Sequence, residues 1–186
     1  MQCIRIGLVL AVAILVGSCG GKSENGKEDL AVKSVDLPGV QRAHEAEGFL
    51  LTAQPDTVGF QEAKKKYGVK TVINLRMPEE TPKFKEPELV KGLGLDYVAI
   101  PFKGPDTLKD EVFDRARQVL KDAGKRPVLM HCKSGNRVGA IWYAYRVLDE
   151  GIEPDVAMKE AKAVGLRKAG HIQKAEEYVK KMSMKK

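Results

Sequence analysis

A cysteine and an arginine lie close together in residues 127–140, the stretch of this sequence best suited to chemistry. Cys132 follows the apolar run 128–130, Arg137 comes soon after it, and Gly135 lies between them. Apolar residues at helical spacing follow Arg137, so the pair is predicted to lie in a loop that leads from a strand into a helix. Free backbone N–H groups and the helix dipole favour an anion at such a helix N-terminus.

These residue types predict nucleophilic chemistry on an oxyanion. A thiol beside an arginine at a helix N-terminus is expected to be deprotonated near neutral pH. An arginine fork fits phosphate bidentately, and Gly135 lets the backbone approach a ligand closely. The alternative is that Cys132 is merely a small buried hydrophobic residue. The glycine turn and the nearby Arg137 favour the reactive interpretation.

Strand-like and helix-like segments alternate around this loop, which predicts an α/β fold with a central, mostly parallel sheet flanked by helices. Ligands of such folds bind at the carboxyl ends of the strands, where Cys132 lies. The predicted strands are 49–53, 70–76, 95–100 and the apolar run before Cys132; the predicted helices are a segment capped by Asp56 and ending near 66, 87–93, one capped by Thr107, one after Arg137, 154–164 and 171–182.

The N-terminal segment, residues 1–18, has the character of a signal peptide. Its apolar run, 6–16, is too short to span a bilayer. Small residues then precede Cys19, which resembles a bacterial lipoprotein signal in which this cysteine carries the lipid; an ordinary secretory signal is the alternative. Residues 19–43 are predicted to be a flexible tether and 44–186 a single domain. Gly20 after the cysteine indicates, by the same resemblance, a lipid anchor in the outer membrane facing the periplasm.

Cysteine count and charge narrow the function classes. Of the three cysteines, Cys3 leaves with the signal and Cys19 takes lipid, so Cys132 is the one thiol left and no intramolecular disulfide is expected. A lone thiol in an oxidising compartment is prone to oxidation, so its presence favours a catalytic role for Cys132.

The formal net charge is +7, which we interpret as a solvated surface that also steers anionic substrates or lipid head groups. Without interleaved aromatic residues, nucleic acid is not an expected partner.

Four segments together resemble the dual-specificity branch of the protein-tyrosine phosphatase superfamily, and the match extends over about 49–179. These segments are 51–55, 68–76, 97–101 and the His-Cys-Lys-Ser-Gly-Asn-Arg loop at 131–137. The nearest group is a bacterial phosphatase-like family, sometimes found beside β-lactamase-like hydrolases, whose loops read His-Cys-x-Ser-Gly-x-Arg. The resemblance implies a cysteine-phosphatase-like fold that acts without a metal or other cofactor.

The resemblance also implies roles for individual residues. Cys132 would attack phosphorus to form a phosphocysteine, while His131 would support the loop. Asp106 would protonate the leaving group, although its position after a proline also suits a turn residue or helix cap, and Asp110 is the alternate. The phosphate would be held by Lys133, Ser134, Gly135, Asn136 and Arg137. The substrate would be a phosphorylated protein, including phosphotyrosine, or a small phosphoester.

Two departures from the usual phosphatase signature keep other functions open. Four residues instead of five separate Cys132 from Arg137, and Val138 replaces the usual hydroxyl-bearing residue. A four-residue loop also occurs in rhodanese sulfurtransferases, so sulfur transfer is one alternative. The Gly-His-Ile segment expected early in a rhodanese is absent from that place, which favours the phosphatase. A non-catalytic, phosphate-binding pseudophosphatase is the other alternative.

The remaining polar candidates are interpreted as structural. Arg76 is predicted to pair with Glu79 or Glu80, and Trp142 is predicted to lie in the core. His44 and His171 have no evident partners in the sequence, so both are expected at the surface.

Overall fold

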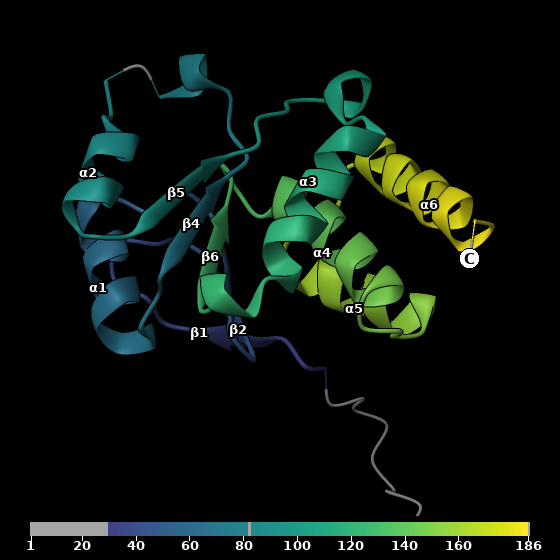
Figure 1. Cartoon of the computed structure of the whole chain (residues 1–186), viewed down its shortest axis with the longest axis horizontal. Coiled ribbons are helices and arrows are strands. Elements are labelled where there is room, and N and C mark those ends of the chain that lie inside the picture. Colours follow the sequence, from purple (N-terminus) through teal and green to yellow (C-terminus); the bar gives the residue numbers. More distant parts are fainter. Residues whose placement is uncertain (1–29, 82, 186) are drawn as a thin grey trace, which may run out of the picture.

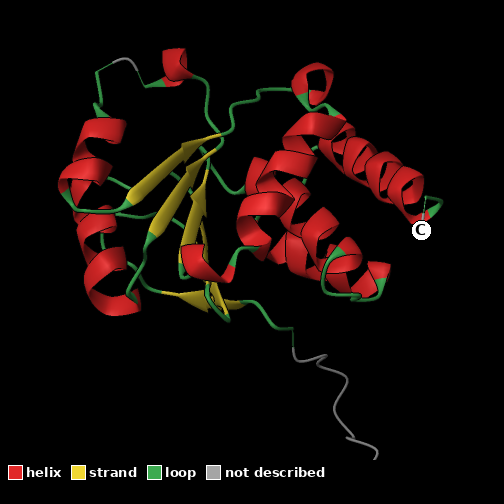
Figure 2. Cartoon of the chain, viewed as in Figure 1, coloured by secondary structure: helices red, strands yellow, loops and turns green. Residues whose placement is uncertain are grey.

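The computed structural model describes residues 30–81 and 83–185, which build one six-stranded sheet with helices on both faces (Figures 1 and 2). The strands stand in the order β1-β2-β3-β6-β4-β5. The three pairings from β3 through β6 and β4 to β5 are parallel, whereas β1-β2 and β2-β3 are antiparallel. This confirms the predicted mostly parallel sheet. The strands are β1 Lys33–Val35, β2 Ala43–Ala46, β3 Phe49–Thr52, β4 Thr71–Asn74, β5 Asp96–Ala99 and β6 Val128–His131.

The helices form two layers with different apolar cores. In Figure 1, α1 and α2 lie on one side of the sheet, and α3 to α6 lie on the other. Because side chains alternate along a strand, β6 serves both cores: Val128 and Met130 join the larger cluster beneath α3 to α6, and Leu129 joins the smaller one. The helices are α1 Thr57–Tyr67, α2 Glu86–Gly92, α3 Asp110–Lys121, α4 Asn136–Leu148, α5 Pro154–Val164 and α6 Ala169–Ser183, with 3-10 turns η1 Pro78–Glu80, η2 Pro105–Thr107 and η3 Ala123–Lys125.

Helix α4, which begins at the end of the candidate loop, is the central helix of the larger layer. Almost every residue from Asn136 to Leu148 is buried, and the helix packs against both α5 and α6. Trp142 lies in the core as predicted, with its ring 5.3 Å from that of Phe49. A helix buried on all sides is fixed in place, so the loop at its N-terminus is held in a defined position.

The structure corrects two boundaries predicted from the sequence. Thr107 does not cap a helix: its hydroxyl accepts from the backbone N–H groups of Lys103 and Gly104, and α3 begins only at Asp110. The predicted tether does not extend to residue 43, because β1 pairs with β2 and Leu37 is buried. The signal segment and Cys19 lie outside the residues that the structure describes. Within 30–81 and 83–185, no helix is long and apolar enough to cross a membrane.

Candidate active site

Cys132 lies just beyond β6, between the ends of its two parallel neighbours β3 and β4. The backbone continues the sheet for one more residue, because Cys132 N–H donates to the Thr52 carbonyl at 3.4 Å. The Cys132 side chain is 1% exposed, and its Sγ accepts the Gly135 N–H at 3.2 Å. Gly135 has φ +88°, and a Cβ there would come within 2.2 Å of the Val164 carbonyl oxygen. The loop therefore requires glycine for its close packing on the end of α5.

A cavity of about 230 Å³ opens over this thiol. Its walls bring together the predicted loop residues and side chains from three other segments of the chain. Four lysine and arginine side chains face it against one carboxylate, which makes the cavity electropositive and suited to an anion. The lining residues are Glu80, Lys103, Cys132, Lys133, Ser134, Asn136, Arg137, Lys168 and His171.

Arg137 is buried in the first turn of α4 and is held along one edge of its guanidinium group. Its Nη1 donates to the carbonyls of Leu75 and Phe102, and its two terminal nitrogens engage Glu80 at 2.6 and 2.8 Å. Burial disfavours the charge, but Glu80 and the nearby Cys132 raise the pKa of Arg137 above its usual value. Nε and one N–H of Nη2 donate to no oxygen among the described residues, which leaves a two-donor edge for phosphate.

Glu80, which fixes Arg137, was not predicted as a site residue. Hydrogen bonding from Arg137 lowers the pKa of Glu80 to about 2, against the opposing effect of burial. Because this pKa lies below its usual value of 4.5, the ion pair stabilises the fold above about pH 4.5 and is lost as pH falls from there towards 2. Arg76 was the one signal for Glu80 in the sequence. The prediction that Arg76 pairs with Glu79 or Glu80 is confirmed by its contact with Glu80 at 3.4 Å.

Arg76 extends this support away from the cavity. Its Nη2 donates to the Glu80 carbonyl at 2.9 Å, and its Nη1 donates to Gln54 Oε1 at 2.7 Å. The Gln54 amide in turn donates to Glu86 Oε2 at 2.8 Å. A continuous chain of hydrogen bonds therefore links the carboxylate that holds the loop arginine to the buried Glu86.

Glu86 connects these hydrogen bonds to His131, at the other end of the loop from Arg137. His131 Nε2 lies 2.9 Å from Glu86 Oε1, which also accepts from the Asn74 amide and the Tyr97 hydroxyl. Burial opposes ionisation, but the hydrogen bond from His131 and its other partners lower the pKa of Glu86. His131 precedes the nucleophile and lines no part of the cavity, so its contacts agree with the predicted supporting role.

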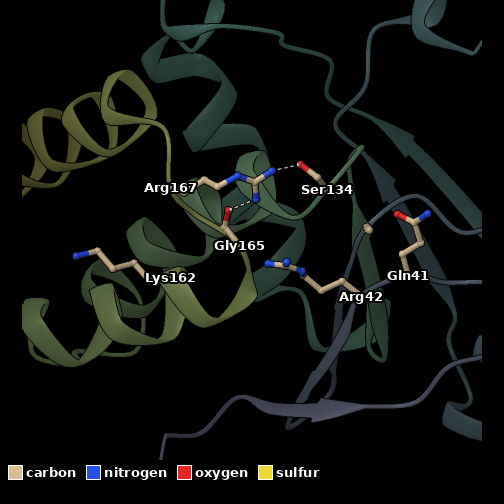
Figure 3. Close-up of a pocket in the computed structure, with 7 residues that line it drawn as sticks. Gln41, Arg42, Ser134, Lys162, Gly165 and Arg167 are labelled. Atoms are coloured by element: carbon tan, nitrogen blue, oxygen red, sulfur yellow. Dashed lines mark hydrogen bonds between the residues drawn. The ribbon is translucent and has the colours of Figure 1, made fainter.

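The predicted phosphate-binding residues Lys133, Ser134 and Asn136 reach the cavity in different ways. Lys133 is exposed and lines the rim. Asn136 Oδ1 accepts the backbone N–H groups of Arg167 and Lys168, both at 2.9 Å, and so fixes the connection between α5 and α6. Ser134 Oγ lies 3.3 Å from Arg167 Nη2 (Figure 3). These side chains therefore organise the walls of the cavity, which Arg137 also lines.

The structure does not bring Asp106 or its alternate Asp110 into the Cys132 cavity. Both line a separate hollow between η2 and α6, and Asp106 is exposed there. The general-acid role of Asp106 therefore stays a prediction.

The predicted surface position of His171 is wrong, because this residue is 2% exposed and lines the cavity; His44 is buried as well. Neither ring nitrogen of His171 has a hydrogen-bonding partner of good geometry among the described residues. Burial, Lys168 and Arg137 lower its pKa, although the Lys103 backbone opposes this. Its ring is therefore neutral near pH 7.

This chain resembles a known protein family and several solved structures. A family model described as DSP-PTPase phosphatase fused to NAD+ kinase matches residues 38–181. No curated protein sequence matches significantly. Among solved structures, a DUF442 protein from Shewanella putrefaciens CN-32 has 26% identity and a TM-score of 0.65, and covers 77% of this chain and 94% of its own. P. aeruginosa TpbA has 23% identity and a TM-score of 0.63, over 82% of this chain and 91% of its own.

Two further structures with this fold contain ligands. A variant of TpbA in complex with pTyr is 22% identical, with a TM-score of 0.63, and covers 82% of this chain and 90% of its own. The catalytic domain of the PP-IP phosphatase SIW14 from S. cerevisiae, in complex with citrate, is 19% identical, with a TM-score of 0.61 over 74% of this chain and 87% of its own. At these identities the likeness concerns the fold.

Proposed function

The chain belongs to the family of DSP-PTPase phosphatases fused to NAD+ kinase and is an enzyme of the tyrosine or dual-specificity phosphatase type, and we propose that it hydrolyses phosphate monoesters through a phosphocysteine on Cys132. The observation that carries this proposal is the two-donor edge of Arg137, from which no oxygen of the described residues accepts a hydrogen bond, beside a buried thiol in an electropositive cavity. The family match does not favour the rhodanese alternative.

In the first step, the Cys132 thiolate attacks phosphorus and the ester oxygen leaves. Arg137 and the loop N–H groups hold the equatorial oxygens, where charge spreads in the transition state. The S–P bond forms as the P–O bond breaks, and a proton must reach the leaving alkoxide or phenoxide. Asp106 is proposed as its donor, which requires the segment around η2 to bring the carboxyl towards the cavity.

In the second step, water attacks phosphorus, the S–P bond breaks, and thiolate and inorganic phosphate are regenerated. The Cys132 thiolate must be a good leaving group in this step. In the usual signature a hydroxyl after the arginine assists it, but Val138 has no hydroxyl. The Gly135 N–H donates to Sγ instead, and Arg137 adds its charge nearby. These two groups support turnover despite the short loop.

The reaction class is tested by measuring two activities of the same purified protein. We expect release of p-nitrophenol and inorganic phosphate from p-nitrophenyl phosphate, and no thiocyanate from thiosulfate and cyanide. The physical reason is that the cavity is lined for a phosphate dianion and its family is a phosphatase family. Thiocyanate formation without phosphate release would contradict the proposal, and binding of phosphate without any turnover would indicate a pseudophosphatase.

Asp106 is tested through its dependence on the leaving group. A general acid contributes about 10²–10⁴-fold, and most for poor leaving groups. Asp106→Asn should therefore slow hydrolysis of phenyl or alkyl phosphates by about 10²-fold and p-nitrophenyl phosphate much less, in a comparison of kcat/KM. Asp110→Asn and His171→Asn are the matched comparisons. If either shows the leaving-group dependence and Asp106→Asn does not, Asp106 is not the acid.

We also propose that the mature enzyme is anchored in the bacterial envelope by lipid on Cys19, at the periplasmic face of the outer membrane. The sequence around Cys19 supports this, and this cysteine lies outside the described residues. Intact mass and membrane fractionation of protein from a bacterial host should show a diacylglyceryl-modified N-terminus at Cys19. A soluble mature protein that begins at another residue would contradict the anchor.

A further inference from the structure

A second cavity, of about 460 Å³, shares Ser134 with the cavity at Cys132 (Figure 3). Its lining contains three cationic side chains, Arg42, Lys162 and Arg167, and no acidic one. In Figure 3 the Arg42 guanidinium points towards Gly165 from one side, and the Arg167 guanidinium lies on the other, while the Lys162 ammonium group points away from both. Two guanidinium groups thus converge on one hollow.

The charge of this cavity is not balanced by the protein. Within 30–81 and 83–185, neither Arg42, Lys162 nor Arg167 forms an ion pair. The Arg167 side chain donates only to Ser134 Oγ and the Gly165 carbonyl. All three side chains are exposed, whereas the half-buried Arg146 forms an ion pair with Glu160. Like charges that converge without a counter-charge favour binding of an anion.

Backbone contacts tie this cavity to the catalytic loop. The Ala53 N–H donates to the Arg42 carbonyl at 2.9 Å, and Ala53 forms an antiparallel bridge with Ser134. Arg42 is thus separated from the catalytic loop by about two strand spacings, or roughly 10 Å. Ser134 lines both cavities, so a small molecule is long enough to reach from one to the other.

The connection between α5 and α6 serves both cavities as well. Its consecutive residues Arg167 and Lys168 line the second cavity and the Cys132 cavity respectively. Asn136, at the start of α4, fixes both backbones through a single side-chain oxygen. The two cationic sites are therefore held in a fixed relation to each other, as recognition of one two-headed ligand requires.

We propose that the Arg42–Lys162–Arg167 cavity binds a second phosphate group of the substrate, so that the enzyme prefers small molecules carrying two phosphates over monophosphates. This inference rests on the proposed function for the position of the first phosphate, at Cys132. The second phosphate is recognised by guanidinium groups and is not cleaved.

The test measures binding without turnover, on protein carrying Cys132→Ser. Dissociation constants are determined by calorimetry for α,ω-alkanediol bisphosphates and for alkyl monophosphates of the same chain length. We expect a bisphosphate of matching length to bind at least about tenfold more tightly, the factor that one charge-assisted contact contributes. Arg42→Gln should reduce this ratio to about twofold or less.

A matched control separates this effect from a general loss of positive charge. Arg115 is an exposed arginine on α3 that lines neither cavity, so Arg115→Gln removes the same charge and should keep the ratio. A preference for the bisphosphate that survives Arg42→Gln overturns the proposal. Absence of phosphate release by the wild type would instead refute the proposed function, because this binding measurement needs no turnover.

A soluble bisphosphate and a doubly phosphorylated lipid head group present the same chemistry to this cavity. Vesicle sedimentation distinguishes these sources, with phosphatidylcholine vesicles that contain phosphatidylinositol monophosphate or bisphosphate. If the bisphosphate is preferred in both assays and the preference depends on Arg42, the proposal is supported for soluble and for lipid substrates. Preference in vesicles alone assigns the second phosphate to a lipid, and no preference in either assay overturns the inference.

Discussion

Cys132→Ser is expected to abolish phosphate release while the protein still binds inorganic phosphate. Serine keeps the size and burial of the side chain, but its hydroxyl is not ionised near neutral pH and is a far weaker nucleophile. Loss of a nucleophile that acts in a catalytic unit costs on the order of 10⁶ in kcat. Steady-state hydrolysis of p-nitrophenyl phosphate at saturating substrate measures this loss.

Phosphate binding should survive because the cradle does not include the thiol. Arg137 keeps its contacts with Glu80, Leu75 and Phe102, and the loop backbone keeps Gly135 in place. Calorimetry with inorganic phosphate should therefore give a dissociation constant similar to that of the wild type. Activity of Cys132→Ser within tenfold of wild type would rule out the phosphocysteine mechanism, and loss of both binding and activity would place the thiol in the cradle.

The sequence predicted the loop itself because its parts are contiguous. The apolar strand, Cys132, Gly135 and Arg137 occur within ten residues of one another, so the local pattern determines strand, turn and helix start. The mostly parallel sheet was also predictable from the local pattern, because helix-like segments alternate with most of the strands along the chain. Two strands, β1 and β2, were missed. Strand β1 is a short edge strand bearing Lys33, and such strands are hard to distinguish from a polar tether.

The walls of the site were harder to predict because they come from distant segments. Glu80, Lys103 and His171 meet Arg137 only when η1, the loop after β5 and the start of α6 converge. His171 was expected at the surface. It lies instead in the first turn of α6, which packs on the loop after β5, and the His171 ring is 5.9 Å from that of Phe102. Thr107 was misread because a hydroxyl that bonds backbone N–H groups serves a turn as well as a helix cap.

The hydrogen-bonded chain from Arg137 to His131 explains residues that the sequence pattern alone left without a purpose. Gln54 and Arg76 belong to two of the segments on which the family resemblance rested, and both lie within this chain. It braces the residue before the nucleophile and the arginine after it through one set of buried contacts. A network of this kind is costly to interrupt, since each member leaves another unsatisfied.

Arg137→Lys is expected to reduce kcat/KM by on the order of 10³, even though it keeps the positive charge. Lysine has no planar fork, so it cannot hold the Glu80 carboxylate along one edge and offer two parallel donors to phosphate along the other. The loss should appear in kcat as well as in KM, because the fork holds the oxygens on which charge develops. Thermal unfolding of the variant checks that the fold is kept.

Glu80→Gln is the informative partner of this substitution, because it leaves Arg137 in place and removes only the charge that orients it. Arg137 retains the carbonyls of Leu75 and Phe102, so we expect a loss of roughly tenfold in kcat/KM, about the contribution of one charge-assisted hydrogen bond. If the fork acts through Glu80, combining the two substitutions should cost little more than Arg137→Lys alone. Full additivity would show that Glu80 and Arg137 act independently, and Arg137→Lys activity within tenfold of wild type would show that a point charge suffices at this site.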